Sequence, residues 1–152
     1  MFAVPANTVA LPATSVHPAL LARDHAADRD RWAHLLRYDP DERFAHLVER
    51  TGDQEVWLMS WLPGQQTDLH DHGGSTGAFA VVSGTLAELV ARPGTRVEHR
   101  LVPGQIRVFG PRYVHQIRNP GPDPAVSIHV YRAGRAMTRF GYGADGSLEP
   151  AG

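Results

Sequence analysis

Three histidines are spaced in a way that could bind a metal ion. His70 and His72 are separated by one residue, and His115 belongs to a different segment of the chain. Side chains on a strand alternate between its two faces, so His70 and His72 point the same way if their segment is extended. Three neutral imidazoles can hold a first-row divalent metal and leave coordination positions open for a substrate. The sequence therefore predicts a mononuclear metal site formed by His70, His72 and His115.

A second polar group occupies alternate positions of a later segment and consists of Ser127, His129 and Tyr131. On a strand these three side chains share one face. The other face of the same segment is apolar, with Val126, Ile128 and Val130. Buried hydroxyl and imidazole groups need hydrogen-bond partners, so Ser127, His129 and Tyr131 can satisfy one another. The pattern predicts a Ser–His–Tyr chain of hydrogen bonds, and the alternative is a polar network that only fixes strand register.

Short strands separated by glycine and proline turns must position both groups. Strands are predicted at residues 54–62, 77–82, 85–91, 95–102, 105–109, 114–118 and 125–132. The segments 77–82 and 85–91 are expected to form a hairpin joined at Ser83-Gly84. Strands that recur at a spacing of about 8–12 residues favour an antiparallel barrel or sandwich. We expect the barrel to span residues 54–140 and the Gly-rich tail after Gly141 to be loosely attached.

The first third of the chain has a different pattern. Residues 1–14 have no strong period and are expected to form an irregular leader. From about Ser15 to Tyr38 the apolar residues follow a helical period, and Pro18 would fall in the first turn. Residues 15–50 are therefore expected to be largely helical, although 42–50 could form either a short helix or a first strand. His25 is expected at the surface of this segment.

Length, charge and composition exclude several functional classes. The 152 residues are expected to form one domain, residues 1–152. Fifteen basic and 16 acidic side chains give a formal net charge of −1, which offers no electrostatic attraction for nucleic acid or an anionic membrane. The absence of cysteine excludes disulfides, thiolate ligands and a cysteine nucleophile. No apolar run approaches the roughly 18 residues of a membrane span, and a cytoplasmic location is expected.

Glycines and an asparagine around the histidines extend the metal motif. They lie at fixed spacings from the three histidines: Gly64, Gly84, Gly104 and Asn119. These spacings resemble the two motifs of the cupin family, small jelly-roll barrels that bind a metal through histidines. The usual cupin glutamate ligand is missing, because residues 75–77 take its place, and Glu88 lies too far along to replace it without a register change. The resemblance implies a mainly β, cupin-type antiparallel jelly-roll barrel with a short N-terminal helical segment and a three-histidine site.

Three blocks resemble one branch of the cupins, the thiol dioxygenases, of which cysteine dioxygenase is the type. They occur in the family's order at residues 70–75, 114–119 and 124–131, and with Trp61 the resemblance covers roughly residues 54–132. It implies an Fe(II) enzyme that adds both atoms of O2 to the sulfur of a small thiol and gives a sulfinic acid. Tyr131 would reach the bound substrate or oxygen, with Ser127 and His129 orienting its hydroxyl.

Two departures from the family pattern concern the substrate. The position of the cysteine that animal-type members crosslink to the tyrosine is taken by Gly77, so the crosslink cannot form. The early-strand position that holds the substrate carboxylate, an arginine or a glutamine in the family, aligns with Ala45. Arg43 could serve with a two-residue shift, and Arg135 and Arg139 are other anion-binding candidates. The substrate-binding candidates are Arg43, Trp61 and Arg139.

The sequence leaves the substrate and two other functions open. The thiol could be cysteine, a mercapto-acid or a bulkier thiol such as a thiolated imidazole, and the oligomeric state is not readable. The alternative function is a non-catalytic metal-binding cupin, a sensor or storage module, which needs the three ligands but not the Ser127, His129 and Tyr131 strand. A zinc hydrolase would use the same three histidines and a water. It is disfavoured because no carboxylate base is evident near the site.

Overall fold

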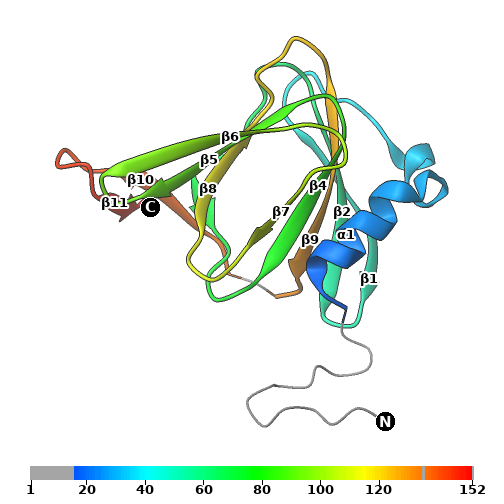
Figure 1. Ribbon diagram of the computed structural model, residues 1–152, viewed down its shortest axis with the longest axis horizontal. Coiled ribbons are helices and arrows are strands. Elements are labelled where there is room, and N and C mark those ends of the chain that lie inside the picture. The colour runs from blue at the N-terminus through cyan, green and yellow to red at the C-terminus, as the bar shows by residue number, and fades with distance from the viewer. Residues whose placement is uncertain (1–15, 135, 152) are drawn as a thin grey trace, which may run out of the picture.

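A computed structural model describes residues 16–134 and 136–151 of the chain (Figure 1). It begins with helix α1 (Pro18–Ala27) and two short 3-10 turns, η1 (Arg29–Arg31) and η2 (Ala33–Leu35). The strands are β1 (Phe44–Thr51), β2 (Gln54–Trp61), β3 (His70–Asp71), β4 (Gly77–Ser83), β5 (Leu86–Arg92), β6 (Thr95–Leu101), β7 (Ile106–Phe109), β8 (Val114–Arg118), β9 (Ala125–Arg132), β10 (Thr138–Tyr142) and β11 (Leu148–Pro150). The expected leader, residues 1–14, and Arg135 lie outside the described residues.

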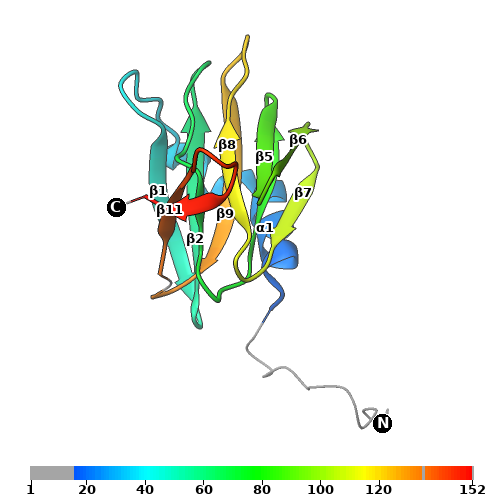
Figure 2. The same cartoon turned by 90° about the vertical axis from the view of Figure 1, so that its left-hand side faces the viewer.

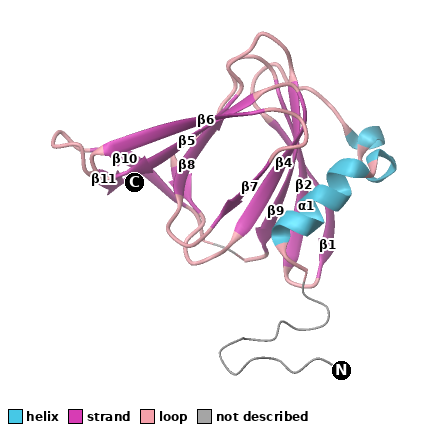
Figure 3. Ribbon diagram, viewed as in Figure 1, coloured by secondary structure: helices cyan, strands magenta, loops and turns pink. Residues whose placement is uncertain are grey.

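The strands form two antiparallel sheets. The order is β1-β2-β9-β4-β7 in the first sheet and β11-β10-β3-β8-β5-β6 in the second. Helix α1 lies against the outer face of the first sheet, where it contacts β4, β9, β7 and β2 (Figures 1 and 3). Figure 2 looks onto the second sheet, with α1 behind. This arrangement confirms the predicted mainly β jelly-roll with one short helix.

Strand β9 is buried on both faces and separates two environments. Val126, Ile128 and Val130 belong to the apolar cluster that also contains Leu21 and Trp32 of the N-terminal segment. Ser127, His129 and Tyr131 alternate with them and, because side chains on a strand alternate, face the interior between the sheets. The apolar face therefore anchors the helix, while the polar face belongs to the barrel interior.

The N-terminal segment is less helical than expected. The α-helix ends at Ala27, and residues 44–51 form β1, which pairs along its length with β2. Of the two alternatives left open for residues 42–50, the structure has the strand, because the backbone of 44–51 finds its partners in a neighbouring strand. His25 is fully buried, not at the surface, and its Nδ1 and Nε2 lie 3.0 Å from the Leu21 carbonyl and 3.1 Å from Glu49. No helix in the described ranges is long and apolar enough to cross a membrane.

The expected hairpin between residues 77–82 and 85–91 was also wrong. Strand β4 pairs with β9 and β7 in the first sheet, whereas β5 pairs with β6 and β8 in the second. Ser83 and Gly84 carry the chain from one sheet to the other. Gly84 has a φ of +73°, and a Cβ there would overlap the carbonyl oxygen of Pro124. The Ser83-Gly84 turn therefore connects the two sheets and does not close a hairpin. The two strands beside it pair with other strands and not with each other.

The barrel continues beyond residue 140. Strand β10 pairs with β3, so that Arg139 is opposite His70, and it pairs with β11 on its other side. The tail after Gly141, expected to be loosely attached, therefore extends the second sheet to Pro150. Strand β10 therefore lies directly beside the predicted ligand His70.

Candidate metal centre

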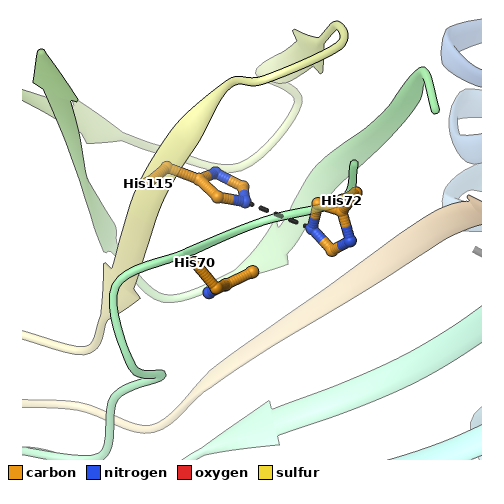
Figure 4. Close-up of side chains that lie close together, drawn as sticks. All are labelled: His70, His72 and His115. Atoms are coloured by element: carbon orange, nitrogen blue, oxygen red, sulfur yellow. Dashed lines mark hydrogen bonds between the residues drawn. The ribbon is translucent and has the colours of Figure 1, made fainter. Parts of the chain in front are cut away.

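The three predicted ligands come together inside the barrel. One ring nitrogen from each of His70, His72 and His115 lies within 4.8 Å of the others, and all three side chains are buried. The Nε2 atoms of His72 and His115 are 3.4 Å apart. In Figure 4 a dashed line joins these two rings, and His70 lies beside them. Convergence of three imidazoles from two segments is the arrangement that a first-row metal ion requires.

Strand pairing holds the histidines in register. His70 lies in β3, which is only two residues long, and His70 pairs directly with His115 in β8. The backbone before β3 is fixed to the same neighbour, because the Thr67 amide donates to the Ile117 carbonyl at 2.8 Å. On the other side, the Phe140 amide donates to the Leu69 carbonyl at 2.8 Å. A strand too short to be stable alone is thus held between β8 and β10.

For His70 and His115, hydrogen bonds set which ring nitrogen faces the centre. His70 Nδ1 lies 2.6 Å from the Asp68 carbonyl oxygen, and His115 Nδ1 lies 2.8 Å from Glu88 Oε2. Both partners only accept hydrogen bonds, so each Nδ1 must carry the proton and donate it. The lone pair of each ring is then on Nε2, the atom directed toward the other imidazoles. Such carbonyl and carboxylate partners are the usual supports of metal-binding histidines.

Burial keeps His70 neutral. It lowers the pKa of His70 from 6.5 to about 4, and the nearby charge of His115 adds to the effect. Burial also lowers the pKa of His129 well below its ordinary value, with the Arg43 guanidinium as the next cause. Near neutral pH, protons therefore compete only weakly with a metal ion for the His70 ring. The donor set fits a divalent transition metal.

Glu88 is the residue near the centre that the sequence did not assign. Its side chain is fully buried behind His115, where Oε2 accepts from the histidine and Oε1 accepts from Arg107 and Tyr113. Burial alone would raise its pKa, but the hydrogen bond and charge of His115, with those of Arg107, hold that pKa below its ordinary value. The sequence feature that could have identified Glu88 is its position as the single acidic residue in the apolar segment 86–91, because a buried charge needs partners.

The same contacts bear on the hydrolase alternative. A carboxylate does lie beside the centre, contrary to the expectation that none would. Both oxygens of Glu88 are already bonded to His115, Arg107 and Tyr113, so the carboxylate is not free to serve as a base toward a metal-bound water.

The Ser–His–Tyr chain of hydrogen bonds is present in β9. Ser127 Oγ lies 2.7 Å from His129 Nε2, and the Tyr131 hydroxyl lies 3.0 Å from His129 Nδ1. Trp61 Nε1 donates to Ser127 Oγ at 2.9 Å. The buried serine proton then has His129 Nε2 as its acceptor, which leaves the proton of His129 on Nδ1, where it is donated to the oxygen of Tyr131. With this polarity, Tyr131 accepts the hydrogen bond from His129.

The rings of Tyr131 and Phe109 pack against His72, with centroid distances of 4.8 and 4.7 Å. Phe109 also occupies the space next to Gly77, where a Cβ would overlap the phenyl ring and approach the Val130 carbonyl oxygen to 2.7 Å. The position of the family's crosslinking cysteine is therefore closed to any side chain. Aromatic packing, instead of a covalent bond, holds Tyr131 beside His72.

A cavity of about 320 Å³ opens onto the centre. His70, His72 and Tyr131 line it, together with Arg43, Ala45, Trp57, Met59, Thr67, Asp68, Met137 and Arg139. Two imidazoles and the tyrosine therefore share a space with cationic side chains. The volume suits a small molecule, at the lower end of the range for ligand sites.

Arg43 is placed at this cavity although the family's arginine position holds Ala45. Its Nη1 lies 3.0 Å from Met59 Sδ, and its guanidinium lies over the Trp61 ring at 5.3 Å. Among the described residues, no carboxylate lies within ion-pair distance of Arg43. A thioether is a weak acceptor, so the guanidinium keeps most of its capacity to bind an anion.

The other two substrate-binding candidates are placed differently. Trp61 is fully buried and is not among the residues that line the cavity. It contacts Ser127 and Arg43 instead, and so helps to hold these two side chains in place. Arg139 does line the cavity, but its side chain is 69% exposed and lies 3.7 Å from Asp68. It belongs to the solvent-facing rim of the cavity.

A jelly-roll with a buried three-histidine cluster is the architecture of a metal-binding cupin. Residues 13–139 match the family described as cysteine dioxygenase type I, and the chain belongs to this family. The family and the three-histidine cluster together indicate a non-haem metal site.

Solved structures with the same fold support this placement. The protein TT1209 from Thermus thermophilus is 26% identical, with a TM-score of 0.60 over 66% of this chain and 92% of that one. A protein with a double-stranded β-helix domain from Klebsiella pneumoniae is 24% identical, with a TM-score of 0.64 over 70% and 86% of the two chains. A cupin superfamily protein from Desulfitobacterium hafniense is 11% identical, with a TM-score of 0.57 over 68% and 88%. The last two likenesses concern the fold alone.

Proposed function

We propose that the protein is a non-haem iron thiol dioxygenase. It combines a small thiol with O2, so that the sulfur gains both oxygen atoms and the thiol becomes a sulfinic acid. The observation that carries the proposal is the shared cavity, in which two of the three histidines, the Tyr131 ring and the Arg43 side chain, which has no carboxylate partner among the described residues, face the same space. A module that only binds metal needs neither the tyrosine nor the arginine.

The donor set suits this reaction. Fe(II) held by His70, His72 and His115 supplies the redox chemistry that lets dioxygen react with a thiol sulfur. Three imidazoles add no negative charge, so the site keeps the full attraction for a thiolate that a carboxylate ligand would reduce. The cavity beside His70 and His72 holds the sulfur and the oxygen close together, which contributes through proximity and orientation.

Tyr131 acts at the reacting end of the cavity. His129 donates to its oxygen, and Ser127 and Trp61 fix the ring of His129, so this chain of hydrogen bonds orients the Tyr131 hydroxyl at the wall of the cavity. A hydroxyl held in this way stabilises negative charge that develops on the reacting atoms. We assign Tyr131 the direct role, and His129 and Ser127 the role of orienting it.

Arg43 binds the other end of the substrate. Its guanidinium is half-buried and matches a carboxylate, with which it can form two parallel hydrogen bonds. The substrate class is therefore a small thiol that carries a carboxylate, such as cysteine or a mercapto-acid. Arg139 and Asp68 at the rim contact the part of the substrate nearest the solvent. Trp61 contributes by holding Arg43 and Ser127 in place.

Oxygen uptake across a panel of thiols tests the proposal. The protein is purified anaerobically, loaded with iron and mixed with O2 and cysteine, 3-mercaptopropionate, cysteamine or a thiolated imidazole. We expect thiol-dependent uptake of one O2 per thiol with a carboxylated substrate, and a product heavier by two oxygen atoms. Oxygen uptake that does not depend on a thiol, or iron binding without uptake on any thiol, would contradict the enzyme and favour a metal-binding cupin without catalysis.

A further inference from the structure

One buried carboxylate connects a metal ligand to the opposite sheet. Glu88 lies in β5 next to β8, and its Oε2 accepts from His115 Nδ1 at 2.8 Å. Its Oε1 accepts from Arg107 Nε at 2.8 Å and from the Tyr113 hydroxyl at 3.1 Å. Arg107 belongs to β7, the edge strand of the first sheet, whereas Glu88 and His115 belong to the second. The carboxylate thus spans the gap between the sheets.

The network needs a carboxylate in particular. Donors approach Glu88 from both sides, and only a group with an acceptor on each oxygen satisfies His115, Arg107 and Tyr113 together. An amide of the same shape would turn its NH2 group toward one of these donors. The side chain has no access to solvent, so water cannot supply the missing acceptor.

We propose that Glu88 is a positioning residue of the metal centre. It holds the proton of His115 on Nδ1 and presents Nε2 to the metal ion, and its negative charge increases the basicity of that nitrogen. Arg107 and Tyr113 hold the carboxylate in place. The proposal rests on the metal site of the proposed function, but not on its thiol or its oxygen chemistry.

A purely structural role makes a different prediction. If the Glu88–Arg107 ion pair only closes the barrel, replacing Glu88 and replacing Arg107 have the same effect on metal affinity. If Glu88 positions His115, the two replacements have different effects. Glu88→Gln removes the charge next to the ligand, whereas Arg107→Gln leaves the Glu88–His115 contact intact and leaves Tyr113 to hold the carboxylate.

Metal affinity separates the two roles. The full-length apoprotein is titrated anaerobically with Fe(II), and in parallel with Co(II), against a chromophoric chelator. Loss of a carboxylate that supports a metal-binding histidine typically weakens affinity by about 10- to 100-fold, which we expect for Glu88→Gln. For Arg107→Gln we expect a change of no more than about 3-fold, together with a lower stability in denaturant, since the buried carboxylate loses its countercharge.

The matched control is Glu98→Gln. Glu98 lies in β6, the strand next to β5, and pairs with Arg118 at 2.8 Å on the surface. It is not in contact with the histidines, so its loss is expected to leave the metal affinity unchanged. Equal weakening by Glu88→Gln and Arg107→Gln, or an unchanged affinity in Glu88→Gln, would overturn the proposal.

A measurement on the unaltered protein keeps the proposal testable if Glu88→Gln does not fold. Nitrogen-15 NMR of labelled histidine in the Zn(II)-loaded protein reports which ring nitrogen carries the proton. We expect a proton on His115 Nδ1 in a strong hydrogen bond, and the metal on Nε2. A metal on Nδ1, or no proton there, would overturn the proposal. If the metal affinities and the NMR result are as expected but the protein oxidises no thiol, the proposed reaction is wrong and the role of Glu88 stands.

Discussion

Replacing Arg43 with methionine, which is of similar length but has no hydrogen-bond donor, tests the assigned substrate class. The guanidinium is half-buried beside the cavity, and no carboxylate among the described residues neutralises it. A hydrogen bond between charged groups contributes about 1.5–3 kcal/mol. Since 1.4 kcal/mol corresponds to a factor of ten, we expect kcat/KM for a carboxylated thiol to fall about 10- to 100-fold.

The assay compares two thiols that differ in the carboxylate. Oxygen uptake by the iron-loaded Arg43→Met variant is measured with 3-mercaptopropionate and with cysteamine, which has the thiol but no carboxylate. We expect the loss only for 3-mercaptopropionate. Arg139→Met serves as the comparison variant, because its exposed side chain at the rim is expected to contribute no more than about 2- to 3-fold.

Two results would refute the reasoning about Arg43. An equal loss for both thiols would show that Arg43 supports the fold through Trp61 and Met59 and does not bind the carboxylate. An unchanged kcat/KM for 3-mercaptopropionate would show that another group holds the substrate. Thermal unfolding of the variant, recorded beside the kinetics, separates a local effect from general destabilisation.

Three further predictions concern the tyrosine, the closed cysteine position and pH. Tyr131→Phe should retain iron while kcat falls about 100-fold, because the hydroxyl acts on reacting atoms; full activity on every thiol would remove its assigned role. Gly77→Cys should lower the free energy of unfolding by about 1–3 kcal/mol through overlap with Phe109, and mass spectrometry should find no crosslink to Tyr131. The pKa of His70 falls from 6.5 to about 4 on folding, so the unfolded chain takes up the proton first. The apoprotein should therefore lose about 3 kcal/mol as pH falls through that range, and denaturant titrations that show no loss between pH 7 and 4 would contradict this.

The parts of the site that depend on short-range spacing could be predicted from the sequence. His70 and His72 share a face because strand side chains alternate, and the same rule places Ser127, His129 and Tyr131 together. His115 is 43 residues from His72 but belongs to a recognisable second motif. The local pattern was therefore sufficient to predict the histidine cluster and the hydrogen-bonded chain.

The parts that depend on distant pairing could not be predicted. Glu88 acquires its role from His115, 27 residues away, and from Arg107 in the other sheet, and neither contact leaves a local pattern. Residues 44–51 form a strand because β2 is beside them, and the 77–91 segment divides between two sheets because β4 and β5 take different partners. In each case tertiary contacts decided what local propensity left open.

X-ray absorption at the iron edge tests the central claim most directly, that three imidazoles bind one iron ion beside a thiol site. The anaerobic, iron-loaded protein is measured before and after addition of a carboxylated thiol. We predict one iron per chain with scattering from three imidazoles, and a sulfur neighbour that appears when the thiol is added. Fewer than three imidazoles, or no sulfur neighbour with any thiol that supports oxygen uptake, would contradict the account.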